Sequence, residues 1–232
     1  MLQTLTQAIG PFGLFDGIAL ALLLTGWPLI GYLVEHEGKQ RSTHSLVSDY
    51  RSRWMSEMVT RDNRMLDAHI LATLRQGAAF FTSASMIGIG GSVALLGQAD
   101  TLQNLAVDIN TELGAPRVVW EVKLMLVVLI LASAFLKFVW SHRLFGYCAV
   151  VLASVPNDPT HKDATRYAEK SAKLNSYAAR SFNRGLRAVY FALAALTWLL
   201  GAWAMIAATL VTLAVLYRRE FNSQSRAALI DL

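Results

Sequence analysis

Charged side chains that could do chemistry gather where a polar segment of this sequence meets an apolar one. They are Arg61, Arg64, Asp67 and Arg75, with His69 among them. Arg64 and Asp67 are three residues apart, and such residues can pair on a helix. Arg75 would lie inside the apolar run that follows, where a charge is costly unless it is paired or hydrated. The cluster therefore predicts either an ion network that ties a surface helix to a helical bundle or the gate of a permeation path.

A second group of charges forms a regular stripe in the segment 162–187. Its seven basic residues are Lys162, Arg166, Lys170, Lys173, Arg180, Arg184 and Arg187. The spacing follows the helical repeat, so all seven would lie along one side of a helix. Two hypotheses remain open for this stripe. It is a solvated face that meets anionic lipid headgroups, or it is a site for an anion or a partner.

Metal and catalytic motifs are absent from the sequence. No two of the five histidines are four residues apart, which removes the simplest helical metal pair. Glu35-His36-Glu37 could ligate a metal at an interface, but a polar helix end explains it equally well. There is also no phosphate loop, dinucleotide fingerprint or nucleophile elbow. We predict no metal site, no cofactor and no enzymatic activity.

The composition indicates that these residues belong to a protein embedded in a lipid bilayer and not to a domain surrounded by water. The chain has 232 residues, of which 54% are hydrophobic and 16% are charged, and its mean hydropathy is +0.39. These values are too apolar for an ordinary soluble domain. The net charge of +5 comes from basic residues that flank apolar runs. We therefore expect the partners to be a bilayer with anionic headgroups, and we expect no binding of nucleic acid.

The apolar runs predict a single all-α membrane domain over residues 1–232. Four transmembrane helices are expected, at about 14–34, 69–97, 118–140 and 187–217. Two basic amphipathic helices, at 42–66 and 162–187, should lie on the cytoplasmic side, because positive charge is retained there. This orientation puts the N-terminus outside. We expect the first amphipathic helix to run on into the second span.

The last apolar run is long for a single crossing. One straight helix over 187–217 would measure about 46 Å, against a hydrocarbon core of roughly 30 Å. Arg184 and Arg187 precede the run, and Arg218 and Arg219 follow it. We favour one long tilted or bent helix. The alternative is a hairpin at Gly201, which would keep both arginine pairs on the cytoplasmic side.

Several motifs resemble an uncharacterised membrane family of bacteria and plants, DUF599. The motifs are Tyr50-Arg51-x-x-Trp54-x-x-x-Met58-x-x-Arg61-x-x-Arg64-x-x-Asp67, Phe80-Phe81-x-Ser83, Lys137-Phe-x-Trp140-Ser-x-Arg143, Phe182-Asn183-Arg184-Gly185-x-Arg187 and Tyr217-Arg218-Arg219-Glu220-Phe221. The resemblance extends over nearly the whole chain. It implies a multi-pass helical protein of the bacterial inner membrane. It implies no reaction and assigns no functional residue.

The functional prediction has two main classes of membrane protein, and a third class, a membrane enzyme that acts on lipid or quinone, has no convincing nucleophile, metal set or cofactor motif to support it. We expect a homo-oligomeric channel or transport protein for a small solute or ion, and the alternative is an accessory or scaffold subunit of a membrane complex. Ala84, Gly88 and Ser92 lie four residues apart in the second span, and small residues at this spacing let membrane helices approach closely. This close packing is either intramolecular or the interface of an oligomer.

Overall fold

The computed structural model describes residues 12–36, 40–98 and 116–230, and these residues form helices and turns without a strand. The helices are α2 (Leu14–Glu35), α3 (Thr43–Met58), α4 (Met65–Gly97), α6 (Arg117–Ala153), α7 (Ala164–Leu196), the short 3₁₀ helix η2 (Thr197–Leu200), α8 (Ala202–Phe221) and α9 (Gln224–Ile230). The all-α architecture predicted from the sequence is confirmed.

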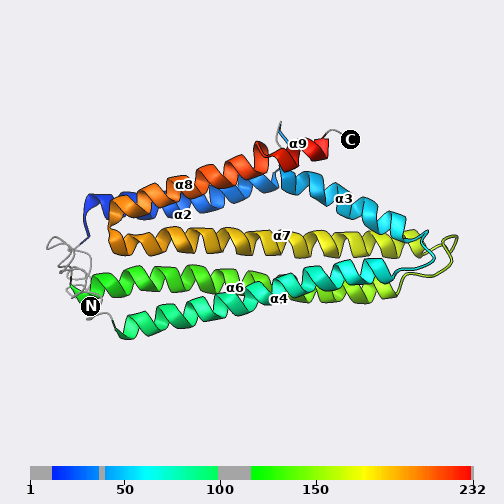
Figure 1. The fold of residues 1–232 in the computed structure, drawn as a ribbon, viewed down its shortest axis with the longest axis horizontal. Coiled ribbons are helices and arrows are strands. Elements are labelled where there is room, and N and C mark those ends of the chain that lie inside the picture. The colour runs from blue at the N-terminus through cyan, green and yellow to red at the C-terminus, as the bar shows by residue number, and fades with distance from the viewer. Residues whose placement is uncertain (1–11, 37–39, 99–115, 231–232) are drawn as a thin grey trace.

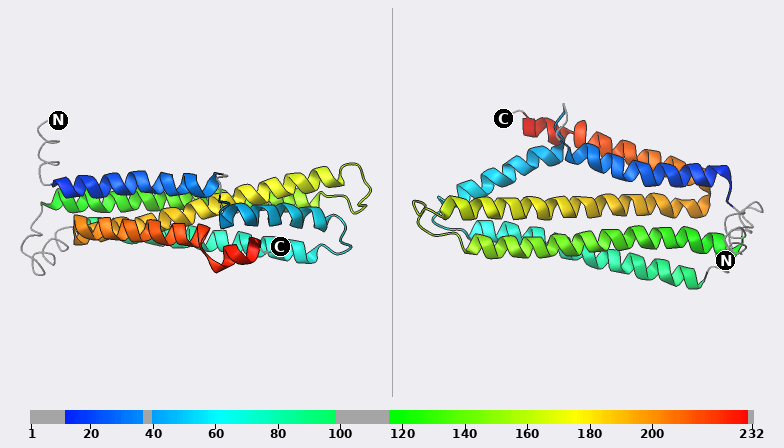
Figure 2. Two further views of the ribbon diagram at one scale, coloured as in Figure 1. Left: turned by 90° about the horizontal axis from the view of Figure 1, so that it is seen from above. Right: turned by 180° about the vertical axis from the view of Figure 1, so that it is seen from behind.

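Helix α7 runs through the middle of an elongated bundle (Figure 1). α2 and α8 pack together beside its C-terminal half, and α3 packs beside its N-terminal half. α6 packs along its other side, and α4 packs on α6. The views from above and from behind show the same long bundle, with the α7–α8 turn at one end and the α6–α7 turn at the other (Figure 2). Every long helix therefore has part of its surface against α7 or α6.

Four helical segments are long and apolar enough to cross a membrane. They are Leu14–Glu35, Met65–Gly97, Arg117–Ala153 and Ala202–Ile230. The first three contain the spans predicted at 14–34, 69–97 and 118–140. α6 continues past its apolar core to Ala153, so the segment 144–153 extends the same helix. The fourth segment begins at Ala202, well after the expected start at position 187.

The expectation of one helix over 187–217 is wrong. α7 ends at Leu196, η2 follows, and α8 begins at Ala202 and runs back beside α7. Gly201 makes this reversal possible with φ 121° and ψ 166°, a backbone conformation that essentially only glycine adopts. The hairpin alternative is therefore the observed one. The predicted amphipathic helix and the first half of the last apolar run form one continuous helix, α7.

The predicted continuation of the first amphipathic helix into the second span is also wrong. α3 ends at Met58, and the chain reverses before α4 begins at Met65. The side chain of Asn63 accepts a hydrogen bond from the Met65 N–H at 2.8 Å. Arg64 donates to the carbonyl oxygens of Val155 and Pro156, each at 2.7 Å. The turn is thus held by local capping and by the neighbouring α6–α7 connection.

Aromatic rings fill the crossing of α4, α6 and α7. The centroid of Phe138 lies 5.3 Å from that of Phe81 and 5.5 Å from that of Phe182. Gly185 faces this group, because a Cβ built there would lie 2.6 Å from Cε1 of Phe138. A larger residue at position 185 would force α6 and α7 apart, so this glycine sets their separation.

The start of α3 is tied to the ends of α2 and α8 and to the middle of α7. Ser42 caps α3 and donates to the carbonyl of Val34 at the end of α2 at 2.7 Å. The backbone N–H of His44 donates to the Glu220 carboxylate at 3.1 Å. The His44 ring lies 3.0 Å from the amide of Asn183 on α7. α3 is therefore anchored to α2, α7 and α8 at one point.

Burial at this anchor lowers the pKa of His44 to about 4, because desolvation disfavours the charged ring. The unfolded chain takes up this proton near pH 6.5, its ordinary value. His44 therefore favours the folded state fully above pH 6.5, and this stability is lost as the pH falls toward 4. We predict that the loss of thermal stability between pH 6.5 and 4 is smaller in His44→Gln than in the parent protein. Equal losses in a thermal scan series would contradict the prediction.

A second prediction concerns the α7–α8 reversal. Gly201→Ala should destabilise the protein by about 1–3 kcal/mol, because alanine is strained at this backbone conformation. Gly90→Ala is the matched control, since Gly90 lies within α4 and a Cβ there meets nothing within 4 Å. Thermal unfolding in detergent should show a lower midpoint for the first variant and an unchanged or slightly higher one for the second. Equal midpoints would argue against a strained turn.

Candidate anion-binding cleft

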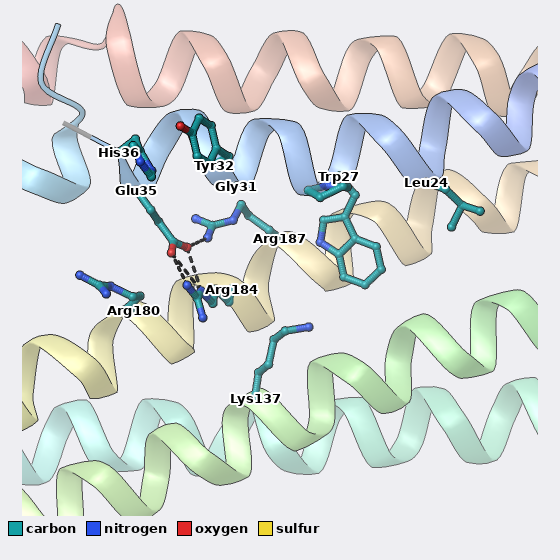
Figure 3. Close-up of a pocket in the computed structure, with 11 residues that line it drawn as sticks. Leu24, Trp27, Gly31, Tyr32, Glu35, His36, Lys137, Arg180, Arg184 and Arg187 are labelled. Atoms are coloured by element: carbon teal, nitrogen blue, oxygen red, sulfur yellow. Dashed lines mark hydrogen bonds and ion pairs between the residues drawn. The ribbon is translucent and has the colours of Figure 1, made fainter. Parts of the chain in front are cut away.

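A cleft of about 690 Å³ lies between α2, α6 and α7. α2 and α6 form its two sides and α7 lies between them (Figure 3). Its lining residues are Leu24, Trp27, Pro28, Gly31, Tyr32, Glu35, His36, Lys137, Arg180, Arg184 and Arg187. The apolar residues all come from α2, and Glu35, Arg180, Arg184 and Arg187 gather at the other end of the cleft, while Lys137 lies beside Trp27. The cleft is therefore amphipathic along its length.

Helix lengths place this cleft at one end of the membrane-crossing region. Glu35 is the last residue of α2, which has 22 residues and starts at Leu14. Lys137 lies in the second half of α6, which begins at Arg117 at the same end of the bundle as the start of α2. A helical stretch of roughly 20 residues measures about 30 Å, the thickness of the hydrocarbon core. The charged end of the cleft thus lies one membrane thickness from the other end of the bundle.

Glu35 is shared by two arginines of α7. Nε of Arg184 donates to both carboxylate oxygens, at 2.9 and 3.1 Å, and its terminal nitrogen also pairs with this carboxylate. A terminal nitrogen of Arg187 pairs with the other side of the carboxylate, and the Arg187 side chain is only 7% exposed. Figure 3 shows the two guanidiniums converging on the one carboxylate. Bidentate pairing of this kind fixes the orientation of both partners.

Two further cations that line the cleft have no partner among the described carboxylates. Nζ of Lys137 pairs with the hydroxyl of Ser133 and lies 5.0 Å from the centroid of the Trp27 ring. Arg180 is exposed, and none of the described carboxylates pairs with it. With Arg184 and Arg187, the cleft has four cations and one described carboxylate. This positive excess suits an anion.

The apolar part of the cleft lies one to three turns before Glu35 on α2. Leu24 and Trp27 point toward the space beside α6, farther from the arginines than Tyr32 (Figure 3). Leu24 is 49% exposed and Tyr32 is 57% exposed, so large apolar surface is open here. A ligand with an anionic head and an apolar chain would match both ends of the cleft.

The structure divides the basic stripe predicted over 162–187. Arg180, Arg184 and Arg187 line the cleft. Lys162 precedes α7, and Arg166, Lys170 and Lys173 are exposed on the N-terminal half of α7, away from the cleft. Only the last part of the stripe therefore meets Lys137 and Glu35. In the sequence Lys137 stood out as part of a family motif, and no local pattern joined it to α7.

The predicted cluster around Asp67 separates into several contacts. Asp67 is fully buried and pairs with Arg61, while Nε1 of Trp54 donates to the same carboxylate oxygen at 2.6 Å. Arg64 does not meet Asp67, because its guanidinium donates to backbone carbonyls at the α6–α7 connection. Nε of Arg75 donates to His142 on α6 at 3.1 Å. These contacts favour the structural interpretation of Asp67 over a gate.

The remaining predicted features are the small residues of the second span and the possible metal ligands. Gly88 faces α6, where a Cβ would lie 3.4 Å from Cδ1 of Leu131, and Ser92 is 8% exposed. Ala84 is exposed. Two of these three small residues thus support intramolecular packing. The described residues contain no group of three His, Cys, Asp or Glu side chains that could hold a metal ion. Glu37, part of the weighed metal motif, lies outside the described residues.

The long apolar helices and the charged cleft at one end of them define a multi-pass α-helical membrane protein. Residues 18–225 match the family described as Protein of unknown function, DUF599, and the chain therefore belongs to that family. The resemblance inferred from the sequence motifs is confirmed. No curated protein and no solved structure matches the chain.

We predict that Asp67→Asn lowers stability, because the amide weakens the buried ion pair with Arg61 and the hydrogen bond from Trp54. The expected loss is about 1–3 kcal/mol, the range for a disrupted buried hydrogen bond. Asp62→Asn is the control, since Asp62 is an exposed carboxylate in the same turn. The unfolding midpoint should fall only in the first variant. A changed permeability without a change in stability would instead support a gate.

Proposed function

We propose that this protein binds a phosphate-bearing amphiphile, such as an anionic phospholipid, in the α2–α6–α7 cleft, and that binding is the first step of its transport. The observation that carries the proposal is the cleft itself, where four cations face one carboxylate beside an apolar wall. Basic pockets between membrane helices on the cytoplasmic side bind phospholipid headgroups in this way.

The proposal includes an orientation in the bacterial inner membrane. The charged end of the cleft and Arg218 and Arg219 lie toward the same end of the bundle, because α8 runs back beside α7. Positive charge near membrane helices is retained on the cytoplasmic side. The charged end is then cytoplasmic, the start of α2 is outside, and the uncharged segment 188–200 of α7 and η2 lies beside the four apolar segments.

Charge balance supports an anionic ligand. A guanidinium that is 7% exposed needs a partner, and Glu35 supplies one for Arg187 and Arg184 together. Lys137 and Arg180 have no such partner among the described carboxylates. A ligand phosphate carries negative charge and several acceptor oxygens, so it would meet these two cations while Glu35 retains the arginine pair.

A second polar group in the same helices supports transport over simple binding. Lys123 lies nearer the start of α6 than Lys137 does, and it is 7% exposed. Its Nζ is 5.5 Å from the centroid of the Trp198 ring, and Nε1 of Trp198 donates to Asp16 of α2 at 2.6 Å. Buried Ile130 lies in the apolar layer between the two ends. A charged headgroup could thus contact polar residues on both sides of this apolar layer, at the charged end of the cleft on one side and near Lys123 on the other.

Binding is tested with purified protein in nanodiscs that contain phosphatidylglycerol and phosphatidylcholine. The parent protein should retain phosphatidylglycerol in preference to phosphatidylcholine. Arg180→Met combined with Lys137→Met should weaken this retention by at least about a hundredfold, because the two lost charge-assisted hydrogen bonds contribute roughly 1.5–3 kcal/mol each. Native mass spectrometry of bound lipid provides the measurement.

Arg166→Met is the matched control, since this exposed arginine belongs to the same stripe but lies outside the cleft. Its lipid preference should equal that of the parent protein. Equal retention in all three proteins would refute the cleft as the binding site.

For transport, Lys123→Met should bind phosphatidylglycerol normally but slow its movement between leaflets of a liposome. If the parent protein moves no labelled lipid, the transport step fails and binding alone remains.

A further inference from the structure

A second cavity lies beyond the membrane-crossing part of the bundle, between α3, α7 and the end of α8. Its volume is about 250 Å³, and its walls carry side chains of all three helices. We infer that this chamber is a binding site for a small soluble oxyanion, either inorganic phosphate or the phosphate group of a small metabolite. The site is independent of the lipid cleft.

The chamber contains an arginine, Arg51, that has no acidic partner among the residues the structure describes. Arg51 of α3 lines the cavity, and its guanidinium donates to Oδ1 of Asn175, which is fully buried on α7. None of the described carboxylates forms an ion pair with Arg51. Burial lowers the pKa of this guanidinium below its usual value. A charge that is desolvated in this way gains from an anion placed beside it.

Neutral hydrogen-bond donors line the same chamber as this arginine. The hydroxyls of Ser48 and Ser176 face each other at 3.4 Å across the α3–α7 contact and line the chamber. Nδ1 of His44 accepts from Nδ2 of Asn183, which leaves Nε2 of the neutral ring as the proton-bearing donor. A phosphate oxygen can accept from a guanidinium, a hydroxyl and an imidazole N–H together. The donor set therefore matches an oxyanion.

Two charged residues of α8 complete the wall. The carboxylate of Glu220 accepts a hydrogen bond from the backbone N–H of His44, so this carboxylate is already engaged with the first turn of α3. Arg219 lines the same chamber, and its guanidinium also contacts the hydroxyl of Tyr190 at 3.0 Å. With Arg51, the described residues that line the chamber include two arginines and one carboxylate. An incoming anion would lie on the Arg51 side, away from Glu220.

The size of the chamber limits the ligand. Clefts for drug-sized molecules measure roughly 300–1,000 Å³, and this one is smaller. The space suits a phosphate group and little more, so an ester would leave its organic part in the opening. The chamber also joins α3 to the end of α8, so a bound anion would link these two elements by bridging Arg51 and Arg219.

The experiment measures anion binding to the purified full-length protein in detergent. Inorganic phosphate should raise the unfolding midpoint and bind in isothermal titration, whereas chloride at matched ionic strength should not. Glycerol 3-phosphate in a second arm distinguishes a phosphate ester from the free ion, according to which binds more tightly. Arg51→Met should abolish the response to both, and binding should weaken at least about tenfold, as expected when a charge-assisted contact is lost.

Arg53→Met is the matched control, because Arg53 lies two residues further on α3, is exposed and does not line this chamber. It should bind phosphate like the parent protein. Arg51→Met should also retain phosphatidylglycerol normally, which separates this site from the lipid cleft. An equal phosphate response in the Arg51 and Arg53 variants, or an equal response to chloride, would overturn the inference.

A further measurement keeps the inference testable if Arg51→Met fails to fold. The His44 ring of the parent protein should show a changed NMR signal and a raised pKa when phosphate is added, because a nearby anion favours the protonated ring. Glu35, Arg180, Arg187 and Arg51 also influence this ring. The titration is therefore compared with and without phosphate at constant ionic strength. An unchanged His44 signal at saturating phosphate would contradict binding in the chamber.

Discussion

The carboxylate of Glu35, shared by Arg184 and Arg187, is the interaction around which the charged half of the bundle is arranged. A nearly buried guanidinium such as that of Arg187 is strongly unfavourable without an acidic partner. The end of α2 must therefore lie against this part of α7. Once α2 is placed there, its apolar residues and Lys137 of α6 face each other across α7, and the amphipathic cleft results.

Helix length explains why two different polar sites lie so near each other. α4, α6 and α7 have 33, 37 and 33 residues, or about 50–55 Å each, whereas a hydrocarbon core measures roughly 30 Å. These three helices therefore continue beyond the membrane, where α3 packs on α7 in place of α2. The α2–α6–α7 cleft lies at the boundary, and the chamber between α3, α7 and α8 lies just beyond it. Both sites use the same helix, α7.

Buried charges in this protein fall into two groups with different meanings. Asp67 is neutralised by Arg61 and receives a hydrogen bond from Trp54, which accounts for it as part of the fold. Arg51 and Lys137 have polar or aromatic neighbours but none of the described carboxylates as a partner. An uncompensated cation beside a cavity is a stronger functional signal than a paired one, because only the former gains from an anionic ligand.

The sequence by itself determined the helical class, the first three apolar spans, the family and the shared helical side of the cleft arginines, because these depend on residues near one another in the chain. Only the tertiary structure showed that the chain reverses at Gly201. The backbone of this residue adopts a conformation that is strained for residues with a side chain. The tertiary structure also decided the charge partners. Glu35 is far from Arg184 in sequence and yet pairs with it, whereas Arg64 binds distant carbonyls in place of nearby Asp67. Which charged side chains pair depends on which helices pack together, and helix packing is determined by the whole core and not by spacing along the sequence.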